Sequence, residues 1–151
     1  MENQEFSPSF FRFEDLRVYQ KAVDYYTWVQ NKVDLFPNKE NNALGNKFII
    51  DALQIATKIA EGSSRNRSLF IENLKESKIA IRHCVVYSTS YAKSLHFSPQ
   101  DLEESRTQLM ELTKMLGALI SSLQRDNRPN SNHHKPNYNK KNIQDYQNNN
   151  Y

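Results

Sequence analysis

Apolar residues recur every three or four positions along most of the chain, which is the spacing of one face of an α-helix. The pattern predicts four helices, over about residues 13–35, 42–60, 68–95 and 99–124. Only three glycines occur, and no long run alternates apolar and polar residues as a strand does. Because short connections between long helices favour antiparallel neighbours, we expect an all-α, up-down-up-down four-helix bundle.

Several residues mark where these helices begin and end. Ser98 can accept hydrogen bonds from the first free N–H groups of the last helix, and Pro99 suits its first position, where a missing N–H costs nothing. Asn66 and Ser68 are both candidate N-caps of the third helix. Gly62 is placed to close the second helix in a left-handed conformation.

The third and fourth helices each carry one core-facing stripe, as helices of a bundle do. In the third helix we expect the stripe to consist of Phe70, Leu74, Ile81, Val85 and Leu95. In the fourth it is a series of leucines at spacings of three, four and seven: Leu102, Leu109, Leu112, Leu116, Leu119 and Leu123.

The first two helices each carry two adjoining apolar stripes, whereas a helix in a monomeric bundle needs one. In the first helix, one stripe contains Tyr19, Val23 and Tyr26, and the other contains Val18 and Tyr25. We therefore expect burial on two sides and a homo-oligomer. The predicted subunit contacts come from Val18, Tyr25, Trp28, Ile49 and Leu53.

The two ends of the chain differ from its middle in composition. Residues 1–11 contain two glutamates and no Lys or Arg, and we expect a flexible N-terminus there. Residues 125–151 contain nine asparagines and a single aliphatic residue, Ile143, so they cannot bury enough apolar surface to offset their chain entropy. We predict a disordered, basic tail there, and a bundle over residues 12–124. The tail carries much of the net charge of +3, and the body is close to neutral.

Cysteine usage and hydropathy point to the cytoplasm. Cys84 is the single cysteine, so no intrachain disulfide forms, and its apolar surroundings predict a buried thiol. The first residues lack the basic and apolar regions of a signal peptide, and the apolar runs are far shorter than a membrane span. We expect a cytoplasmic protein without a membrane partner.

Candidate catalytic groups have simpler explanations. His83 and Cys84 are neighbours, but adjacent helical residues point about 100° apart and do not face each other. Glu72 lies at helix spacing from Lys75, which is an ordinary surface pair, and Glu61 either accepts hydrogen bonds at a helix end or contacts a partner. No glycine-rich phosphate loop and no set of residues with metal-ligand spacing is present. We expect neither an enzyme nor a metal or cofactor.

Positive charge gathers around the second helix junction. The cluster comprises Lys58, Arg65, Arg67, Lys75, Lys78 and Arg82. Only Glu61, Glu72 and Glu76 oppose it within this stretch. If subunits form a ring, the cluster is repeated into a band that can contact many phosphates, which predicts nucleic-acid binding. An ordinary solvated helical face is the alternative.

Three segments, in order, resemble one protein family. They are FEDLRVYQKA (residues 13–22), FPNKENNAL (residues 36–44) and IAEGSSRN (residues 59–66). Together with the closing leucine helix, they resemble the four-helix-bundle proteins encoded in 23S rRNA intervening sequences over about residues 13–124.

The resemblance implies a four-helix bundle, commonly assembled as a ring of five, with no catalytic activity and no cofactor. A branch with a similar bundle is the accessory subunit of diversity-generating retroelements, a pentamer that binds a reverse transcriptase and nucleic acid. This chain departs from the family on the second helix, where Ile49 and Ile50 replace the usual arginine pair. We therefore carry two hypotheses: an oligomer that binds RNA or DNA, and a protein-interaction scaffold, for example an accessory subunit of a reverse transcriptase.

Overall fold

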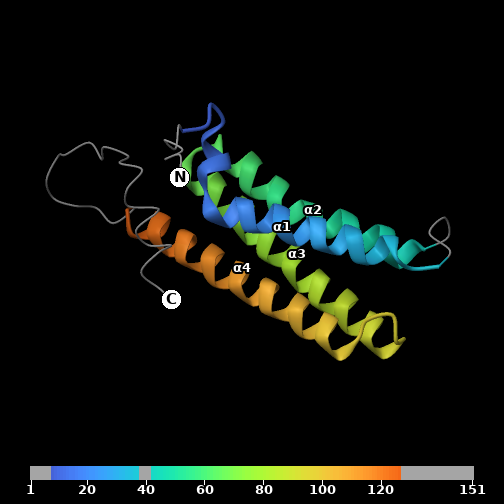
Figure 1. Ribbon diagram of the computed structural model, residues 1–151. Helices are drawn as coiled ribbons and strands as arrows, with labels where there is room; N and C mark the ends of the chain where they lie inside the picture. Colours follow the sequence, from blue (N-terminus) through green and yellow to red (C-terminus); the bar gives the residue numbers. More distant parts are fainter. Residues whose placement is uncertain (1–7, 38–41, 127–151) are drawn as a thin grey trace, which may run out of the picture.

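A computed structural model describes residues 8–37 and 42–126, and the regular secondary structure in this part of the chain is all helical (Figure 1). Residues 127–151 of the predicted tail and the first seven residues lie outside the described residues, and Arg125, where the tail was predicted to begin, is the last residue of α4. The elements are a short 3-10 helix and four long helices: η1 (Arg12–Asp15), α1 (Arg17–Asp34), α2 (Ala43–Ser63), α3 (Arg67–Lys93) and α4 (Pro99–Arg125).

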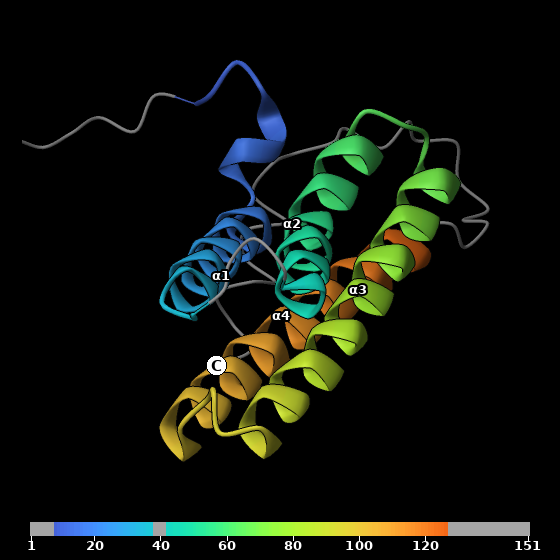
Figure 2. The ribbon, with the colours of Figure 1, turned by 90° about the vertical axis from the view of Figure 1, so that its right-hand side faces the viewer.

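The four long helices run alternately up and down, so the predicted bundle topology is confirmed. Each helix packs against the next in the sequence, and α4 returns to lie against α1. Figure 2 shows α2 between α1 and α3, and α4 passing behind these helices. The pairing of α2 with α3 is the most extensive, and that of α1 with α4 is the least extensive of the four. None of the helices in the described residues combines the length and the apolarity needed to cross a membrane.

The helix ends follow the predicted capping residues, with the exception of Gly62. Ser98 accepts a hydrogen bond from the Asp101 N–H at 3.1 Å, and Asp101 accepts one from the Ser98 N–H, which forms a capping box. Of the two candidates for α3, Asn66 is the N-cap. Gly62 does not have the predicted left-handed conformation; it lies within α2, which ends at Ser63. Among residues 8–37 and 42–126, the left-handed position is Leu95, at φ 62°, in the turn between α3 and α4.

The first helix begins later than its apolar pattern predicts. Residues Arg12–Asp15 form the separate helix η1, and Leu16 is extended at φ −73° and ψ 123°, so α1 begins at Arg17. The break allows the chain before α1 to turn across the end of the bundle, where η1 packs on α1 and α2.

The core is formed by one stripe from each helix. In α4 the predicted leucines from Leu109 to Leu123 are buried, and in α3 Leu74 and Ile81 are buried. Leu95 is not a core residue as predicted: it is 90% exposed, and Phe97 occupies the end of the core instead. Because the left-handed turn at Leu95 reverses the chain, the helical periodicity no longer applies there.

Three buried hydroxyl groups cross the centre of the bundle. Tyr25 of α1 and Ser88 of α3 each lie within hydrogen-bonding distance of Ser105 of α4, at 2.9 and 2.6 Å. Ser88 donates its single hydroxyl proton to the Cys84 carbonyl at 2.8 Å, so Ser105 donates to Ser88 and Tyr25 donates to Ser105. The chain of donors thus connects α1, α4 and α3, and burial raises the pKa of the Tyr25 phenol.

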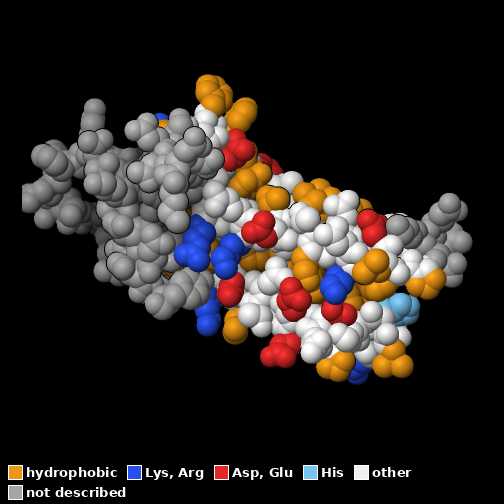
Figure 3. Space-filling view, in the orientation of Figure 1, with side chains coloured by type: hydrophobic (Ala, Val, Ile, Leu, Met, Phe, Trp, Pro, Cys, Tyr) orange, Lys and Arg blue, Asp and Glu red, His pale blue; other side chains and the backbone are white. Residues whose placement is uncertain are grey.

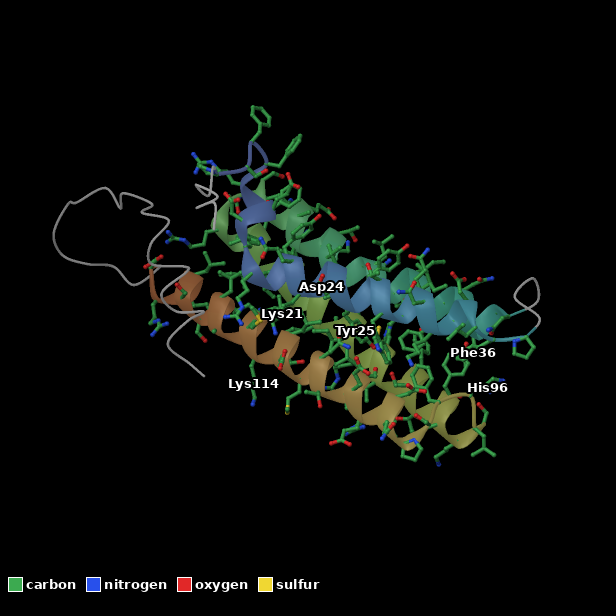
Figure 4. All side chains as sticks on the ribbon, viewed as in Figure 1. Lys21, Asp24, Tyr25, Phe36, His96 and Lys114 are labelled. Atoms are coloured by element: carbon green, nitrogen blue, oxygen red, sulfur yellow. The ribbon has the colours of Figure 1, made fainter. Side chains whose placement is uncertain are left out.

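The seam between α1 and α4 is closed near its surface by charge pairs. Lys21 contacts Glu111 at 2.6 Å, and Lys32 contacts Asp101 at 2.7 Å. Figure 4 shows Lys21 and Tyr25 on the side of α1 that faces α4. On the face of the molecule that Figure 3 shows, negative, positive and hydrophobic side chains are interspersed, and no broad basic area is seen.

Candidate nucleic-acid interface

The predicted basic cluster lies where α2 passes into α3, and this junction is tightly packed. Gly62 of α2 is buried, and a Cβ atom built on it would lie 2.7 Å from the Asn73 Cβ and 2.8 Å from the Phe70 ring. Such a distance is far below an ordinary contact between carbon atoms. The glycine is therefore needed for the close approach of α2 to α3, and not for a turn.

Arg65 of the cluster is part of this packing. Its guanidinium donates a hydrogen bond to the Asn73 side-chain oxygen at 2.9 Å. Asn73 is 2% exposed, and its amide donates to the Lys58 carbonyl of α2 at 3.3 Å. Arg65 thus satisfies a buried amide that connects the two helices, which is a structural role that the sequence interpretation did not foresee.

Three further members of the cluster contact carboxylates. Lys58 lies 2.9 Å from Glu76 and 3.6 Å from Glu61, and its hydrogen bond to Glu76 raises the pKa of its ammonium group. The predicted pair of Lys75 with Glu72 is present at 3.4 Å. For Glu61 the sequence allowed either hydrogen bonding at a helix end or contact with a partner; within the chain it pairs with Lys58 of the same helix.

Arg67 completes this group in a way that its position in the sequence does not suggest. Its guanidinium lies 3.9 Å from the carboxylate of Asp126, at the end of α4, and its side chain is only 17% exposed. Four of the six predicted residues are thus engaged within the molecule, and the charge offered by the junction is smaller than the number of basic residues implies.

The remaining two residues, Lys78 and Arg82, lie one turn apart on α3. Neither forms an ion pair or a side-chain hydrogen bond with any residue that the structure describes. Arg82 is exposed and Lys78 is half-buried. They share the outer side of α3 with Lys75, as predicted. Arg106 and Lys114 of α4 also lack such partners within residues 8–37 and 42–126, and the sequence interpretation did not include them because it placed the basic cluster on α2 and α3.

The predicted subunit contacts need a correction. Val18 and Tyr25 are fully buried in the core of a single chain, so they have no surface to offer a second subunit. The stripe of α1 that contains them is the core stripe, and its neighbour with Tyr19, Val23 and Tyr26 is half-buried at the surface.

The other three predicted contacts retain exposed surface. Trp28 and Ile49 are half-buried, and Leu53 is 40% exposed on the outer side of α2. Trp28 also packs within the chain: its ring stacks on Tyr25 and meets Phe97 edge to face. Ile49 and Leu53 therefore remain the more accessible candidates for a contact between subunits.

The histidine and cysteine of α3 do not form a catalytic pair. Cys84 is buried, and its surroundings raise the pKa of the thiol, whereas His83 points outward and lies 3.4 Å from Asp51 of α2. The Tyr87 hydroxyl donates to the same carboxylate at 2.5 Å, and this bond raises the pKa of Tyr87 to about 12. Within the described residues no three His, Cys, Asp or Glu side chains are grouped so that they could hold a metal ion.

Comparison with known proteins does not assign the chain to a family or a function. No protein-family model matches the chain, and no curated protein sequence matches it.

Proposed function

We propose that this protein is a non-enzymatic, homo-oligomeric four-helix-bundle module that binds nucleic acid, in the first instance RNA, through the outer side of α3. The resemblance of residues 13–22, 36–44 and 59–66 to the proteins of 23S rRNA intervening sequences supports the class of function. The bundle topology is the one that this resemblance implies.

The observation that carries the proposal is the pair of Lys78 and Arg82. A phosphate competes directly with any carboxylate that already contacts a cation, so cations without such partners are the better phosphate ligands. Among the six basic residues predicted to bind, Lys58, Arg67 and Lys75 contact carboxylates and Arg65 is held by the buried Asn73 amide. Lys78 and Arg82 form neither an ion pair nor a side-chain hydrogen bond with the described residues. Lys75 lies beside them, and its contact with Glu72 is exposed and therefore weak.

Repetition of these basic residues on every subunit of an oligomer would supply the affinity that one subunit lacks. Two or three cations give little affinity, because each phosphate contact contributes a small, salt-dependent share. In a closed oligomer, such as the pentamer that the resemblance implies, the same side chains recur on every copy, and simultaneous contacts multiply the affinity for a long strand.

The test is a double charge reversal with a matched control. Lys78→Glu with Arg82→Glu should weaken binding of a fluorescent RNA of mixed sequence, and of a second, unrelated RNA equally, because phosphate contacts carry no sequence information. The slope of binding against salt should fall by about one unit for each phosphate that is no longer bound. The control is Lys47→Glu with Lys93→Glu, which changes the net charge by the same amount at two exposed positions elsewhere and should weaken binding less.

Two results would contradict the proposal. Wild-type protein that binds no RNA at about 50 mM salt, where electrostatic binding is strong, would refute nucleic-acid binding. Binding that survives the double reversal and is abolished by truncation after Asp126 would move the site to the basic residues beyond α4.

A second candidate function is a protein-interaction scaffold, for example an accessory subunit of a reverse transcriptase. Ile50 is 57% exposed and Leu53 40% exposed on the outer side of α2, where the resembling family has an arginine pair near the same place. Exposed aliphatic side chains favour contact with protein over contact with phosphates. Association with a purified reverse transcriptase that persists at high salt and is abolished by Ile50→Glu would support this candidate.

A further inference from the structure

Two aromatic side chains project into solvent immediately before η1. Phe10 is 90% exposed and Phe11 is 58% exposed, and their rings meet edge to face with centroids 5.2 Å apart. Single exposed apolar side chains are common on soluble proteins, but two adjoining rings form a continuous apolar protrusion. Figure 3 shows hydrophobic side chains standing clear of the surface at the end of the molecule where η1 lies. We call Phe10 and Phe11 the aromatic knob.

The backbone beside the knob is held in place. The Ser9 N–H donates to the Asp15 carboxylate at 3.2 Å, and the Ser9 hydroxyl donates to Glu14 at 2.8 Å. These bonds fasten the residue before the knob to η1, so the two rings are presented outward in a defined arrangement. A preorganised apolar group loses less entropy on binding than a flexible one.

A groove of matching character lies between α3 and α4. Its volume is about 720 Å³, and its walls include Ile81 and Val85 of α3 with Leu102, Leu109 and Met110 of α4. This size is within the range of pockets that hold organic ligands, roughly 300–1,000 Å³. Met110 is 51% exposed, so an apolar side chain of the groove contacts solvent in the isolated chain. Arg106 and Lys114 also line it, against the single acidic residue Glu103.

The knob cannot reach the groove of its own chain. It precedes η1, which packs on α1 and α2 at the end of the bundle where α1 begins. The groove lies over Pro99–Lys114, at the other end of α4 and on the face formed with α3. A helix of 27 residues such as α4 is about 40 Å long, and the knob is fastened to η1 by Ser9. If the knob occupies a groove of this kind, the groove belongs to another molecule.

We propose that the aromatic knob of one copy inserts into the α3–α4 groove of a second copy. The net charges are opposite: residues 1–16 carry Glu2, Glu5, Glu14 and Asp15 against Arg12, which gives −3, whereas the groove is lined by Arg106 and Lys114 against Glu103, which gives +1. Knob and groove are different surfaces, so the contact is head-to-tail, and successive contacts of this kind close into a ring or continue as a filament.

This proposal rests on the homo-oligomer of the proposed function and specifies the contact between its subunits. Two phenylalanine side chains cover roughly 300–500 Å². A stable pair of proteins needs about 1,200 Å² or more. In a ring each subunit takes part in two such contacts, once through its knob and once through its groove, so every subunit is held by two neighbours.

The first test measures the mass of the full-length chain by sedimentation velocity over a range of concentrations. Phe10→Ser with Phe11→Ser, and separately Met110→Glu, should raise the dissociation constant of the oligomer roughly tenfold or more, which corresponds to about 1.4 kcal/mol. Leu95→Ser is the control for the knob, because Leu95 is 90% exposed, as Phe10 is. Ile79→Glu is the control for the groove, because Ile79 is 53% exposed and Met110 is 51% exposed. Both controls should remain assembled.

The second test measures proximity and keeps the knob and Met110 intact. Chains with Pro8→Cys and chains with Thr107→Cys are mixed and oxidised; Pro8 adjoins the knob, Thr107 lines the groove, and the native Cys84 is buried. Disulfide-linked dimers should form in this mixture and not when Ile79→Cys replaces Thr107→Cys. This arm decides the question if Met110→Glu fails to fold, as judged by circular dichroism.

The outcomes separate the two proposals. A wild-type chain that is monomeric at all concentrations would overturn the oligomer and the knob contact together. A wild-type oligomer that is unaffected by the knob variant, or that gives no preferential link between the positions of Pro8 and Thr107, would overturn the knob contact and leave the oligomer standing.

Discussion

Gly62→Ala and Gly117→Ala form a matched pair that measures how tightly α2 is packed on α3. Both replace a helical glycine, and the change is worth about 0.5–1 kcal/mol in favour of alanine when space is free. At Gly117 nothing lies within 4 Å of a new Cβ, so this variant should be more stable than the wild type by about that amount. At Gly62 the new Cβ would lie 2.7 Å from the Asn73 Cβ. Carbon atoms prefer about 3.5–4.0 Å, so the helices must separate by roughly 1 Å.

Asn73 is poorly able to move aside. Its side chain accepts a hydrogen bond from Arg65 and donates one to the Lys58 carbonyl, and any shift weakens both bonds in a buried position. Overpacking of this kind costs about 1–3 kcal/mol, so Gly62→Ala should be less stable than the wild type by about 1–2 kcal/mol after the helical gain. Urea unfolding followed by circular dichroism, at one fixed protein concentration because the protein is proposed to self-associate, measures both variants. Equal stabilisation by the two substitutions would show that the junction is not tightly packed.

Two further predictions concern stability. Leu112→Ala removes a buried side chain from the middle of the α4 stripe and should lower the free energy of unfolding by roughly 2–5 kcal/mol; a decrease below about 0.5 kcal/mol would contradict the orientation of α4. The hydrogen bond from Lys32 lowers the pKa of Asp101, so this carboxylate contributes stability above its unfolded pKa of about 3.9 and loses that contribution as pH falls through its folded pKa. The difference in stability between the wild type and Asp101→Asn should therefore be largest near neutral pH and disappear in acid, and a constant difference from pH 7 to pH 2 would refute it.

The sequence pattern sufficed where a helix end is encoded locally. Ser98, Pro99 and Asp101 form a cap from adjacent residues, and the prediction for α4 was correct at its start. The predictions for Gly62 and Leu95 were wrong because both depend on distant contacts. Gly62 is required by Phe70 and Asn73 across the junction, and Leu95 turns outward so that Phe97 can enter the core.

The candidate site was harder to predict than the fold, since charge along a sequence does not tell which cations are already paired. Arg67 and Asp126 are far apart in the sequence and meet only because α3 and α4 are antiparallel. Likewise, an apolar stripe beside another gives no sign of which one faces the core. On α1 the stripe with Val18 and Tyr25 is the internal one, and the Tyr25 hydroxyl has a partner there in Ser105 of α4, which the sequence of α1 alone does not reveal.

The three hydroxyl groups of the core select one register of α4 against its neighbours over the registers shifted by a helical turn. An entirely aliphatic interface would let α4 slide along its neighbours by one turn, about 5.4 Å, and exchange one leucine contact for another of similar value. With Tyr25, Ser88 and Ser105 in place, the same slide would leave buried hydroxyls without partners, at about 1–3 kcal/mol each. Replacing Tyr25 with phenylalanine and both serines with alanine would thus preserve helicity and hydrophobic content while removing the penalty on the shifted arrangements. Such a chain would populate several alternative registers, and its amide resonances would be doubled or broadened.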